Sequence, residues 1–303
     1  MADANTAPSP STYPCVRAAR RFDASRHVAF RIAGVQAGWV RRRDVPLLDA
    51  WAHIFEIDER SVSLRAEFDT VDARSQVLGE VIDALAAQGH IPGWRNETYA
   101  IRNRFDDPPM AFIERAASRF FGTQTYAVHL NGVVAQGGVT RMWIARRSLQ
   151  KATDPGMLDN LVGGGISWGY GVEDTLAKEC WEESGLPDAL ARRAVRGGTI
   201  HVLQEIDEGT QAEQLFIFDL DVGTDFEPAN QDGEVADHRL ASIDAVRDWI
   251  ADAKMTVDAS LAALDWMARH GALDDAARAA LDALAIAPDA AALGATSGAA
   301  SGA

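Results

Sequence analysis

The apolar positions in the first third of the chain follow two different periods. Short stretches that alternate between apolar and polar residues, separated by Gly34 and Gly38, are typical of strands. Residues 71–89 carry apolar side chains at helical spacing and predict an amphipathic helix, and residues 110–122 predict a shorter helix. We therefore expect residues 23–120 to form a small α+β module.

Longer alternating stretches follow and predict a second, larger unit. Residues 125–134 and 140–148 indicate two strands joined by a turn, and two more strand-like stretches lie between residues 191 and 222. An amphipathic stretch over residues 258–287 predicts helix. Strands mixed with helices in this way are typical of an α/β domain, which we expect over residues 121–270.

The two ends of the chain differ in composition from its middle. Residues 1–22 are polar and rich in Pro and Ser, so we expect a disordered tail. They contain no apolar stretch of the kind that a secretory signal needs, and no run in the chain approaches the roughly 18 apolar residues of a membrane span. For residues 271–303 we expect a helical and low-complexity tail, because the last of them are mostly Ala, Gly and Ser.

Charge and cysteine content narrow the expected partners and compartment. The 303 residues carry a formal net charge of −15, with 47% hydrophobic residues. Nucleic acids and anionic membranes attract basic surfaces, so neither is an expected partner. The two cysteines, Cys15 and Cys180, cannot build a disulfide framework, and no zinc-binding spacing occurs. A chain without a disulfide framework suits a reducing compartment, so we expect a cytoplasmic protein.

Three carboxylates are concentrated in one predicted helix. Helix-forming residues run from about Gly171 to Gly185, where glycine favours the left-handed backbone conformation that ends a helix. Within this stretch Glu179, Glu182 and Glu183 stand at i, i+3 and i+4, so they share one face of the helix. Lys178 precedes Glu182 by one turn and is placed to orient its carboxylate.

The residues before this helix point to phosphate and metal chemistry. We expect Gly163, Gly164 and Gly165 to form a tight turn after a strand, where backbone without Cβ atoms lets a phosphate approach closely. Clustered carboxylates beside such a turn suit a hard cation such as Mg²⁺. The simpler alternative is an acidic helix face that is merely solvated.

Other candidate contacts for a substrate lie outside the helix. Trp94, Asn96 and Glu97 combine an aromatic ring with planar polar groups, which is how proteins hold a heteroaromatic ring, although ordinary packing is the alternative for Trp94. His129 and Asn131 alternate with apolar neighbours along one strand, so their side chains should share its other face. They are candidate ligands, with a structural role as the alternative.

Basic and acidic residues near these strands complete the candidate site. Arg146 and Lys151 lie shortly before the glycines and would bind an anionic end of a substrate, unless they form a solvated edge. Glu213 and Glu234 would add carboxylates for a metal or a general base. The pattern does not choose among Glu183, Glu213 and Glu234 as the base.

The glycines and the acidic helix together resemble the Nudix box, G-x5-E-x7-R-E-U-x-E-E-x-G-U. The matching positions are Gly164, Glu179, Glu182, Glu183, Gly185 and Leu186, with Lys178 at the arginine position. Tyr170 departs from the pattern, because it stands where the first Glu is usual. The resemblance implies an α/β/α Nudix sandwich with a mixed sheet, preceded by the small α+β module. It also implies that Glu179, Glu182 and Glu183 bind Mg²⁺ or Mn²⁺ and that a diphosphate is hydrolysed.

Further motifs make the chain resemble a subgroup of Nudix proteins that carry an N-terminal domain of unknown function and are similar to the Nudix half of fungal thiamine pyrophosphokinases. They include WRNETYAI at residues 94–101, MWIARRSLQKATDPGMLDNLVGGG at 142–165 and NQDGEV at 230–235. This resemblance implies that thiamine diphosphate, or its oxy and oxo analogues, is cleaved to the monophosphate and phosphate. A kinase is not expected, because only about 30 residues follow the Nudix part, too few for a further domain.

Two other functions remain open at this level. One is hydrolysis of a nucleoside diphosphate compound such as 8-oxo-dGDP or ADP-ribose. The other is a non-catalytic sensor of a diphosphate metabolite, which Tyr170 in place of Glu would favour. In each case the expected partner is a small-molecule diphosphate, and the protein is expected to be a monomer or a homodimer.

Overall fold

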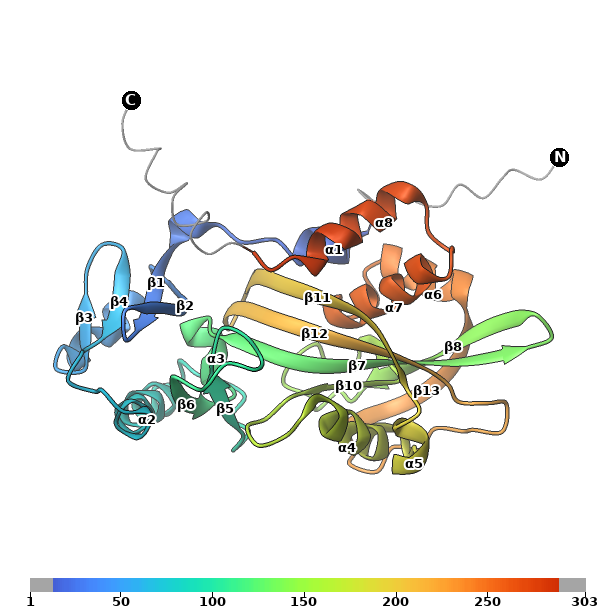
Figure 1. Cartoon of the computed structure of the whole chain (residues 1–303), viewed down its shortest axis with the longest axis horizontal. Helices are drawn as coiled ribbons and strands as arrows, with labels where there is room; N and C mark the ends of the chain where they lie inside the picture. Colours follow the sequence, from blue (N-terminus) through green and yellow to red (C-terminus); the bar gives the residue numbers. More distant parts are fainter. Residues whose placement is uncertain (1–12, 289–303) are drawn as a thin grey trace.

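A computed structural model describes residues 13–288 of the chain (Figure 1). It consists of a small N-terminal module beside a larger domain, in which a twisted sheet lies between two layers of helices. Among residues 13–288, no helix combines the length and the apolar character needed to cross a lipid bilayer.

The N-terminal module is built on a four-stranded sheet. Its strands are β1 (His27–Ile32), β2 (Val35–Arg41), β3 (Phe55–Ile57) and β4 (Ser61–Leu64), in the order β2-β1-β4-β3. A 3-10 helix, η2 (Ala24–Arg26), precedes β1, and a second one, η3 (Val45–Trp51), connects β2 to β3. The predicted amphipathic helix is α2 (Val71–Ala87), whose apolar face is buried and whose first turn is capped by the Thr70 side chain. The α+β prediction for this module agrees with these elements.

The module also contains a second, two-stranded sheet, which shares its core. It pairs β5 (Thr98–Ile101) with β6 (Ala111–Glu114), and α3 (Ala117–Phe121) follows. The helix predicted over residues 110–122 is therefore wrong in its first half. Buried and half-buried residues alternate along β6, which is the period of a strand, and pairing with β5 satisfies its backbone.

The larger domain contains a seven-stranded mixed sheet. Its main path runs β11-β12-β7-β8-β13, while β10 pairs with β7 and β9 with β8. The β12 and β7 strands are parallel, and the other pairs are antiparallel. The strands are β7 (Gln124–Gln136), β8 (Val139–Arg147), β9 (Leu158–Asn160), β10 (Val162–Gly165), β11 (Val195–Ile206), β12 (Gly209–Asp221) and β13 (Val235–Ser242).

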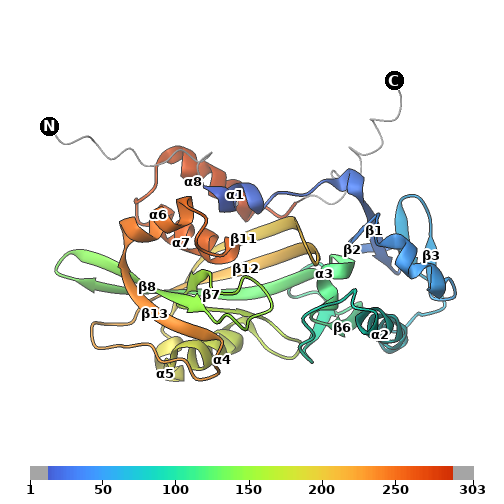
Figure 2. The same cartoon turned by 180° about the vertical axis from the view of Figure 1, so that it is seen from behind.

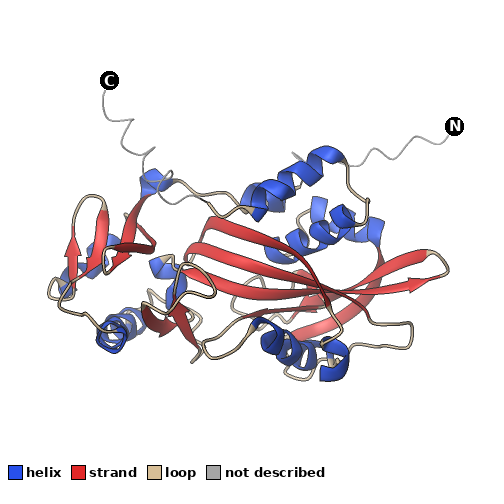
Figure 3. Cartoon of the chain, in the orientation of Figure 1, coloured by secondary structure: helices blue, strands red, loops and turns tan. Residues whose placement is uncertain are grey.

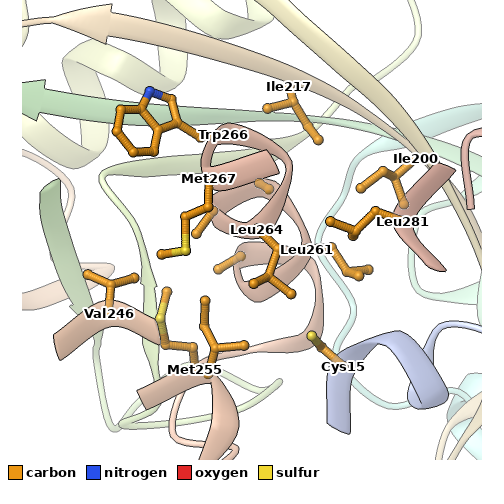
Figure 4. Close-up of a cluster of buried hydrophobic side chains, with 14 of the residues drawn as sticks. Cys15, Ile200, Ile217, Val246, Met255, Leu261, Leu264, Trp266, Met267 and Leu281 are labelled. Carbon is orange, nitrogen blue, oxygen red and sulfur yellow. The ribbon is translucent and has the colours of Figure 1, made fainter. Parts of the chain in front are cut away.

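Helices cover both faces of this sheet (Figures 2 and 3). On one face lie α4 (Val172–Ser184) and the short α5 (Asp188–Ala191). The other face is covered by α6 (Ile243–Ala251), α7 (Val257–Arg269) and α8 (Asp275–Asp282), followed by η4 (Ala283–Ala285). Figure 4 shows part of the core on this side, where residues of α7 meet Ile200 and Ile217 of the sheet. The predicted α/β/α sandwich with a mixed sheet is confirmed.

The first and last described segments belong to the folded body, not to tails. Tyr13 and Cys15, at the short helix α1 (Pro14–Ala18), are buried in the same core as α7, and Leu281 of α8 is buried there too. Backbone amides of Leu203 and Glu205 in β11 donate to the carbonyls of Ala19 and Arg21. The predicted tail over residues 1–22 is thus wrong for residues 13–22, because apolar side chains there find a core. Residues 1–12 and 289–303 lie outside the described part.

Candidate active site

The acidic side chains are presented by α4. This helix begins after Gly171 and ends at Gly185, whose φ of 67° is left-handed, as the sequence predicted. Leu176 and Cys180 are buried in a core shared with the sheet, and this packing fixes the rotation of the helix about its axis. The carboxylates of Glu179 and Glu182 consequently lie at the edge of that core.

The glycines before α4 form a strand, not the predicted tight turn. Gly163, Gly164 and Gly165 are the end of β10 and pair with β7 residues 127–129. Because glycine has no Cβ atom, side chains from other elements occupy the space beside these residues. A Cβ on Gly164 would stand 2.3 Å from Cδ of Glu179, and a Cβ on Gly163 would stand 2.9 Å from Cε1 of His129.

Two lysines neutralise the three carboxylates in the structure. Lys178 Nζ lies 2.6 Å from Glu182 Oε2 and 3.1 Å from Glu179 Oε1, so it bridges both. Glu183 points elsewhere, because it accepts a hydrogen bond of 2.8 Å from the Gly163 amide and lies 3.5 Å from Lys151 Nζ. The helix face thus contains two acid–cation groups, one around each lysine.

The loop before β13 adds a fourth carboxylate. The Gln231 amide donates to the Glu182 carbonyl at the end of α4, which fixes the loop against this helix. Glu234 then forms an ion pair with Lys151, and Arg95 Nη1 lies 3.8 Å from its Oε1. Of the two loop and strand acids considered as a base, Glu234 therefore stands beside α4.

Burial disfavours the ionised forms of two of the α4 carboxylates. Burial raises the pKa of Glu183 to about 8, although Lys151 opposes the rise. Burial also raises the pKa of Glu179, with the Lys178 charge opposing it. Two buried carboxylates with raised pKa values would be stabilised by additional positive charge.

The carboxylates of α4 and the residues around them decide whether a divalent cation fits here. As the side chains stand, no three His, Cys, Asp or Glu residues within 13–288 come close enough to hold one metal ion. Glu179 and Glu182 nevertheless converge on one cation, the Lys178 ammonium, and Glu183 is the next residue of the helix. Carboxylate oxygens are the ligands that Mg²⁺ and Mn²⁺ prefer, so these residues fit such an ion chemically.

The N-terminal module holds the loop that leads into α4. Glu97 Oε2 accepts a hydrogen bond of 3.0 Å from Ser167 Oγ, and the Trp168 amide donates to the Thr98 carbonyl. The Trp168 ring also lies 4.9 Å from that of Phe112 in β6. The path of the chain from β10 to α4 is therefore set partly by β5 and β6.

A second set of bonds fixes the loop at residues 94–97. The Glu114 carboxylate accepts hydrogen bonds from the Arg95 and Glu97 amides, at 2.9 and 3.1 Å. Asn96 between them has a φ of 59°, and its Oδ1 accepts a 2.9 Å hydrogen bond from Trp94 Nε1. Trp94 is 41% exposed, which is more open than the packing alternative predicts.

Four other predicted contacts are not brought to α4. His129 and Asn131 are buried on the face of β7 that α7 covers, where both bond to Asn160. Glu213 lies on the same face, and Thr125 Oγ1 donates to it at 2.9 Å. Arg146 is paired with Asp237 on β13. His129, Asn131 and Glu213 belong to a separate network between the sheet and α7, whereas Arg146 lies at the edge of the sheet.

That network contains two buried acids that share one amide. Gln211 Nε2 donates to Glu213 Oε2 at 2.6 Å and to Asp258 Oδ2 at 3.0 Å. The other oxygen of Asp258 is buried and has no hydrogen-bond partner among residues 13–288. Burial and the Glu213 charge raise the pKa of Asp258 to about 6, while the Arg119 charge opposes burial and lowers the pKa of Glu213.

The raised pKa of Asp258 predicts a pH-dependent stability. A carboxyl whose pKa rises on folding stabilises the fold when protonated, and this contribution is lost as pH rises from about 4 to about 6. The side chain that Asp258→Asn introduces is neutral at every pH. The free energy of unfolding of this variant, relative to that of the natural chain, should therefore rise by about 2 kcal/mol between about pH 4.5 and 7.5. Urea unfolding at both pH values measures the difference.

Asp275→Asn is the matched control for this experiment. Asp275 also lies in the first turn of a helix, α8, but is exposed, so it shares the helix-dipole interaction without the burial. Its effect on the free energy of unfolding should not change between the two pH values. A difference for Asp258→Asn that is equally flat with pH would contradict the protonated, buried carboxyl.

Sequence reasoning missed one charged residue of the site. Arg115 follows β6, and its Nη1 lies 3.1 Å from Glu97 Oε2. A Cβ on Gly165 would stand 2.0 Å from the Tyr99 hydroxyl and 3.3 Å from Arg115 Cζ, so both side chains lie against the end of β10. The alternation in residues 111–114 was the available signal, because it places Arg115 after a strand and not inside a helix.

Two domain families match the chain, one after the other. Residues 11–125 match a domain of unknown function (DUF4743), and residues 127–261 match the NUDIX domain. A relative from Arabidopsis thaliana, Nudix hydrolase 24, chloroplastic, is 36% identical over 247 residues, which are 80% of this chain and 68% of the relative. Nudix hydrolase 20, chloroplastic, from the same plant is 35% identical over 254 residues, with the same coverage of 80% and 68%.

Solved structures are similar over about half of the chain. The structure of DR0079 from Deinococcus radiodurans is 22% identical, covers 56% of this chain and 98% of its own, and gives a TM-score of 0.41.

Both plant relatives are named as chloroplastic, so the cytoplasmic location expected for this chain stays a prediction.

Proposed function

The chain belongs to the Nudix hydrolase family, and we propose that its substrate is thiamine diphosphate or, preferably, one of its oxidised oxy and oxo analogues. As a Nudix pyrophosphohydrolase it is an enzyme, in contrast to the sensor considered from Tyr170. The products would be the thiamine-type monophosphate and phosphate. The cofactor we propose is Mg²⁺ or Mn²⁺.

The observation that carries this proposal is the position of the loop at residues 94–97 beside the catalytic helix. The loop belongs to the motif WRNETYAI, on which the resemblance to the Nudix half of fungal thiamine pyrophosphokinases rests. Trp94 offers an exposed aromatic face, Asn96 and Glu97 offer planar polar groups, and Glu97 bonds to Ser167 just before α4. A ring held here would place its diphosphate towards α4.

We assign two roles to the acidic residues, metal binding and proton transfer. Glu179, Glu182 and Glu183 would hold the divalent ion, which when bound neutralises charge on the phosphoryl oxygens and lowers the pKa of water. Lys178 orients Glu179 and Glu182 through its two ion pairs. We assign the general base to Glu234, because it is a carboxylate beside α4 that is exposed enough to meet water.

Electrostatics favour an ionised Glu234 at neutral pH. Burial alone would raise the pKa of Glu234, but Lys151, Arg95 and Arg115 together lower it. An ionised carboxylate accepts a proton from an attacking water, as a general base must. Glu213 is the weaker candidate, since its carboxylate is buried under α7 and already bonded to Thr125 and Gln211.

A substrate panel tests the proposal. Thiamine diphosphate, its oxy and oxo analogues, 8-oxo-dGDP and ADP-ribose are assayed for phosphate or monophosphate release with Mg²⁺ and with Mn²⁺. We expect a thiamine compound to give the highest kcat/KM, and the oxidised analogues to exceed thiamine diphosphate, because one altered oxygen gains or loses a hydrogen bond of about 1 kcal/mol.

Glu182→Gln protein, purified in the same way, is the control for contaminating phosphatases in this panel. Preference for 8-oxo-dGDP or ADP-ribose over every thiamine compound would discard the proposed substrate. It would leave the hydrolase and its acidic helix unaffected, because both classes of substrate contain the same diphosphate.

A further inference from the structure

Arg115 of the N-terminal module lies at the end of the strand that leads into the catalytic helix. Its guanidinium lies against Gly165, the last residue of β10, and its Cζ is 5.7 Å from the centre of the Tyr99 ring. The backbone around it is fixed, because the Arg115 amide donates to the Glu97 carbonyl and its own carbonyl accepts from Ser118. The point from which the side chain extends is therefore fixed on both sides.

The guanidinium keeps hydrogen-bonding capacity that the protein does not use. Nη1 bonds to the Glu97 carboxylate at 3.1 and 3.2 Å, whereas Nη2 has no hydrogen-bond partner among residues 13–288. The side chain is 39% exposed, so a ligand can reach it. An arginine that served only to hold Glu97 would more commonly use both nitrogens, since its planar fork matches a carboxylate.

Arg115 faces the acidic group together with two other cations. Arg95 and Lys151 contact Glu234, and Lys151 also contacts Glu183. Arg115 lies against Gly165, and the Glu179 carboxylate lies against Gly164, the preceding residue of β10. Three cations from three separate segments thus lie near the acidic residues at the end of β10 and α4.

We propose that Arg115, with Arg95 and Lys151, forms an anion subsite that binds the diphosphate of the substrate opposite the α4 carboxylates. This inference rests on the proposed function for the nature of the substrate, but the subsite recognises the diphosphate and not the ring. Two of its three cations come from the module, so the module supplies part of the phosphate-binding wall. A diphosphate carries several negative charges, which a guanidinium binds through parallel charge-assisted hydrogen bonds.

Arg115→Ala tests the subsite with a probe that needs no knowledge of the ring. Methylenediphosphonate, a diphosphate mimic that cannot be hydrolysed, is used as a competitive inhibitor in Mg²⁺, with the best substrate of the panel. We expect both its Ki and the substrate KM to rise by about tenfold or more, because charge-assisted hydrogen bonds are lost. The value of kcat should fall less than KM rises, and Arg115→Lys should recover part of the loss.

Arg43→Ala is the matched control, because Arg43 is an arginine of the same module whose side chain is 62% exposed. It should leave Ki and KM unchanged. If Arg115→Ala lowers the Tm by several degrees, Arg115→Gln, which keeps a long side chain without its charge, decides the question through the same Ki. Ki and KM within twofold of the natural values in a folded Arg115 variant that lacks the charge would overturn the subsite. Because the mimic has no ring, that result leaves the thiamine preference to the substrate panel.

Discussion

Glu182→Gln should lower kcat by about a thousandfold or more, which corresponds to about 4 kcal/mol of barrier. The substitution keeps the shape of the side chain but removes its charge. That charge meets Lys178 at 2.6 Å, and Glu182 is one of two carboxylates that converge on a single cation. Steady-state hydrolysis at saturating Mg²⁺ measures the loss.

The fold should survive this substitution. Glu182 is only partly buried at the edge of α4, so a neutral side chain there costs little, and the Tm should stay within a few degrees. Glu173→Gln is the control, because Glu173 is an exposed acid of the same helix, in its first turn. It should retain nearly full activity. A Glu182→Gln enzyme with nearly natural kcat would contradict the assignment of this helix face to the metal.

Gly164→Ala should lower kcat/KM by about a hundredfold or more without changing any ionisable group. The added Cβ would stand 2.3 Å from Cδ and 2.5 Å from Cγ of Glu179, distances that real atoms do not adopt. Glu179 must therefore rotate away from β10, which separates it from Glu182 and from Lys178. Overpacking of this kind costs about 1–3 kcal/mol of stability, which urea unfolding measures separately from activity.

Gly79→Ala is the control, because it replaces a glycine by alanine at a position where no side chain is displaced. A Cβ on Gly79, in the middle of α2, meets nothing within 4 Å. Alanine there should stabilise the helix by up to about 1 kcal/mol and leave activity unchanged. If Gly164→Ala retains kcat/KM within threefold of the natural chain, the position of Glu179 against β10 is not needed for catalysis.

Local patterns along the chain were sufficient to predict the catalytic helix. Gly171 and Gly185 mark its ends in the structure, and the i, i+4 spacing of Lys178 and Glu182 produces the ion pair expected from it. Such features depend on residues within one or two turns, and both the helical period and glycine caps act over that range. The α/β/α sandwich was predictable for a similar reason, together with the family resemblance.

Features that depend on distant contacts were not predictable from the pattern. The three glycines have the composition of a turn, but pairing with β7 makes them a strand, and the side chains that need their space come from three other elements. His129 and Asn131 were correctly placed on one face of their strand, yet nothing local indicates that α7 covers that face. Arg115 directly follows β6, whose position depends on its pairing with β5, and no local pattern indicates that pairing.

The module that carries Arg115 is anchored to the larger domain at both of its ends. Before it, α1 packs in the core of α7 and α8, and after it, the chain passes through α3 directly into β7. A segment held at two ends stays at a high effective concentration beside its binding surface when one anchor loosens. Arg115 and Glu97 would therefore stay within reach of α4 even if one of the two anchors opened transiently, because complete detachment needs both to release at once.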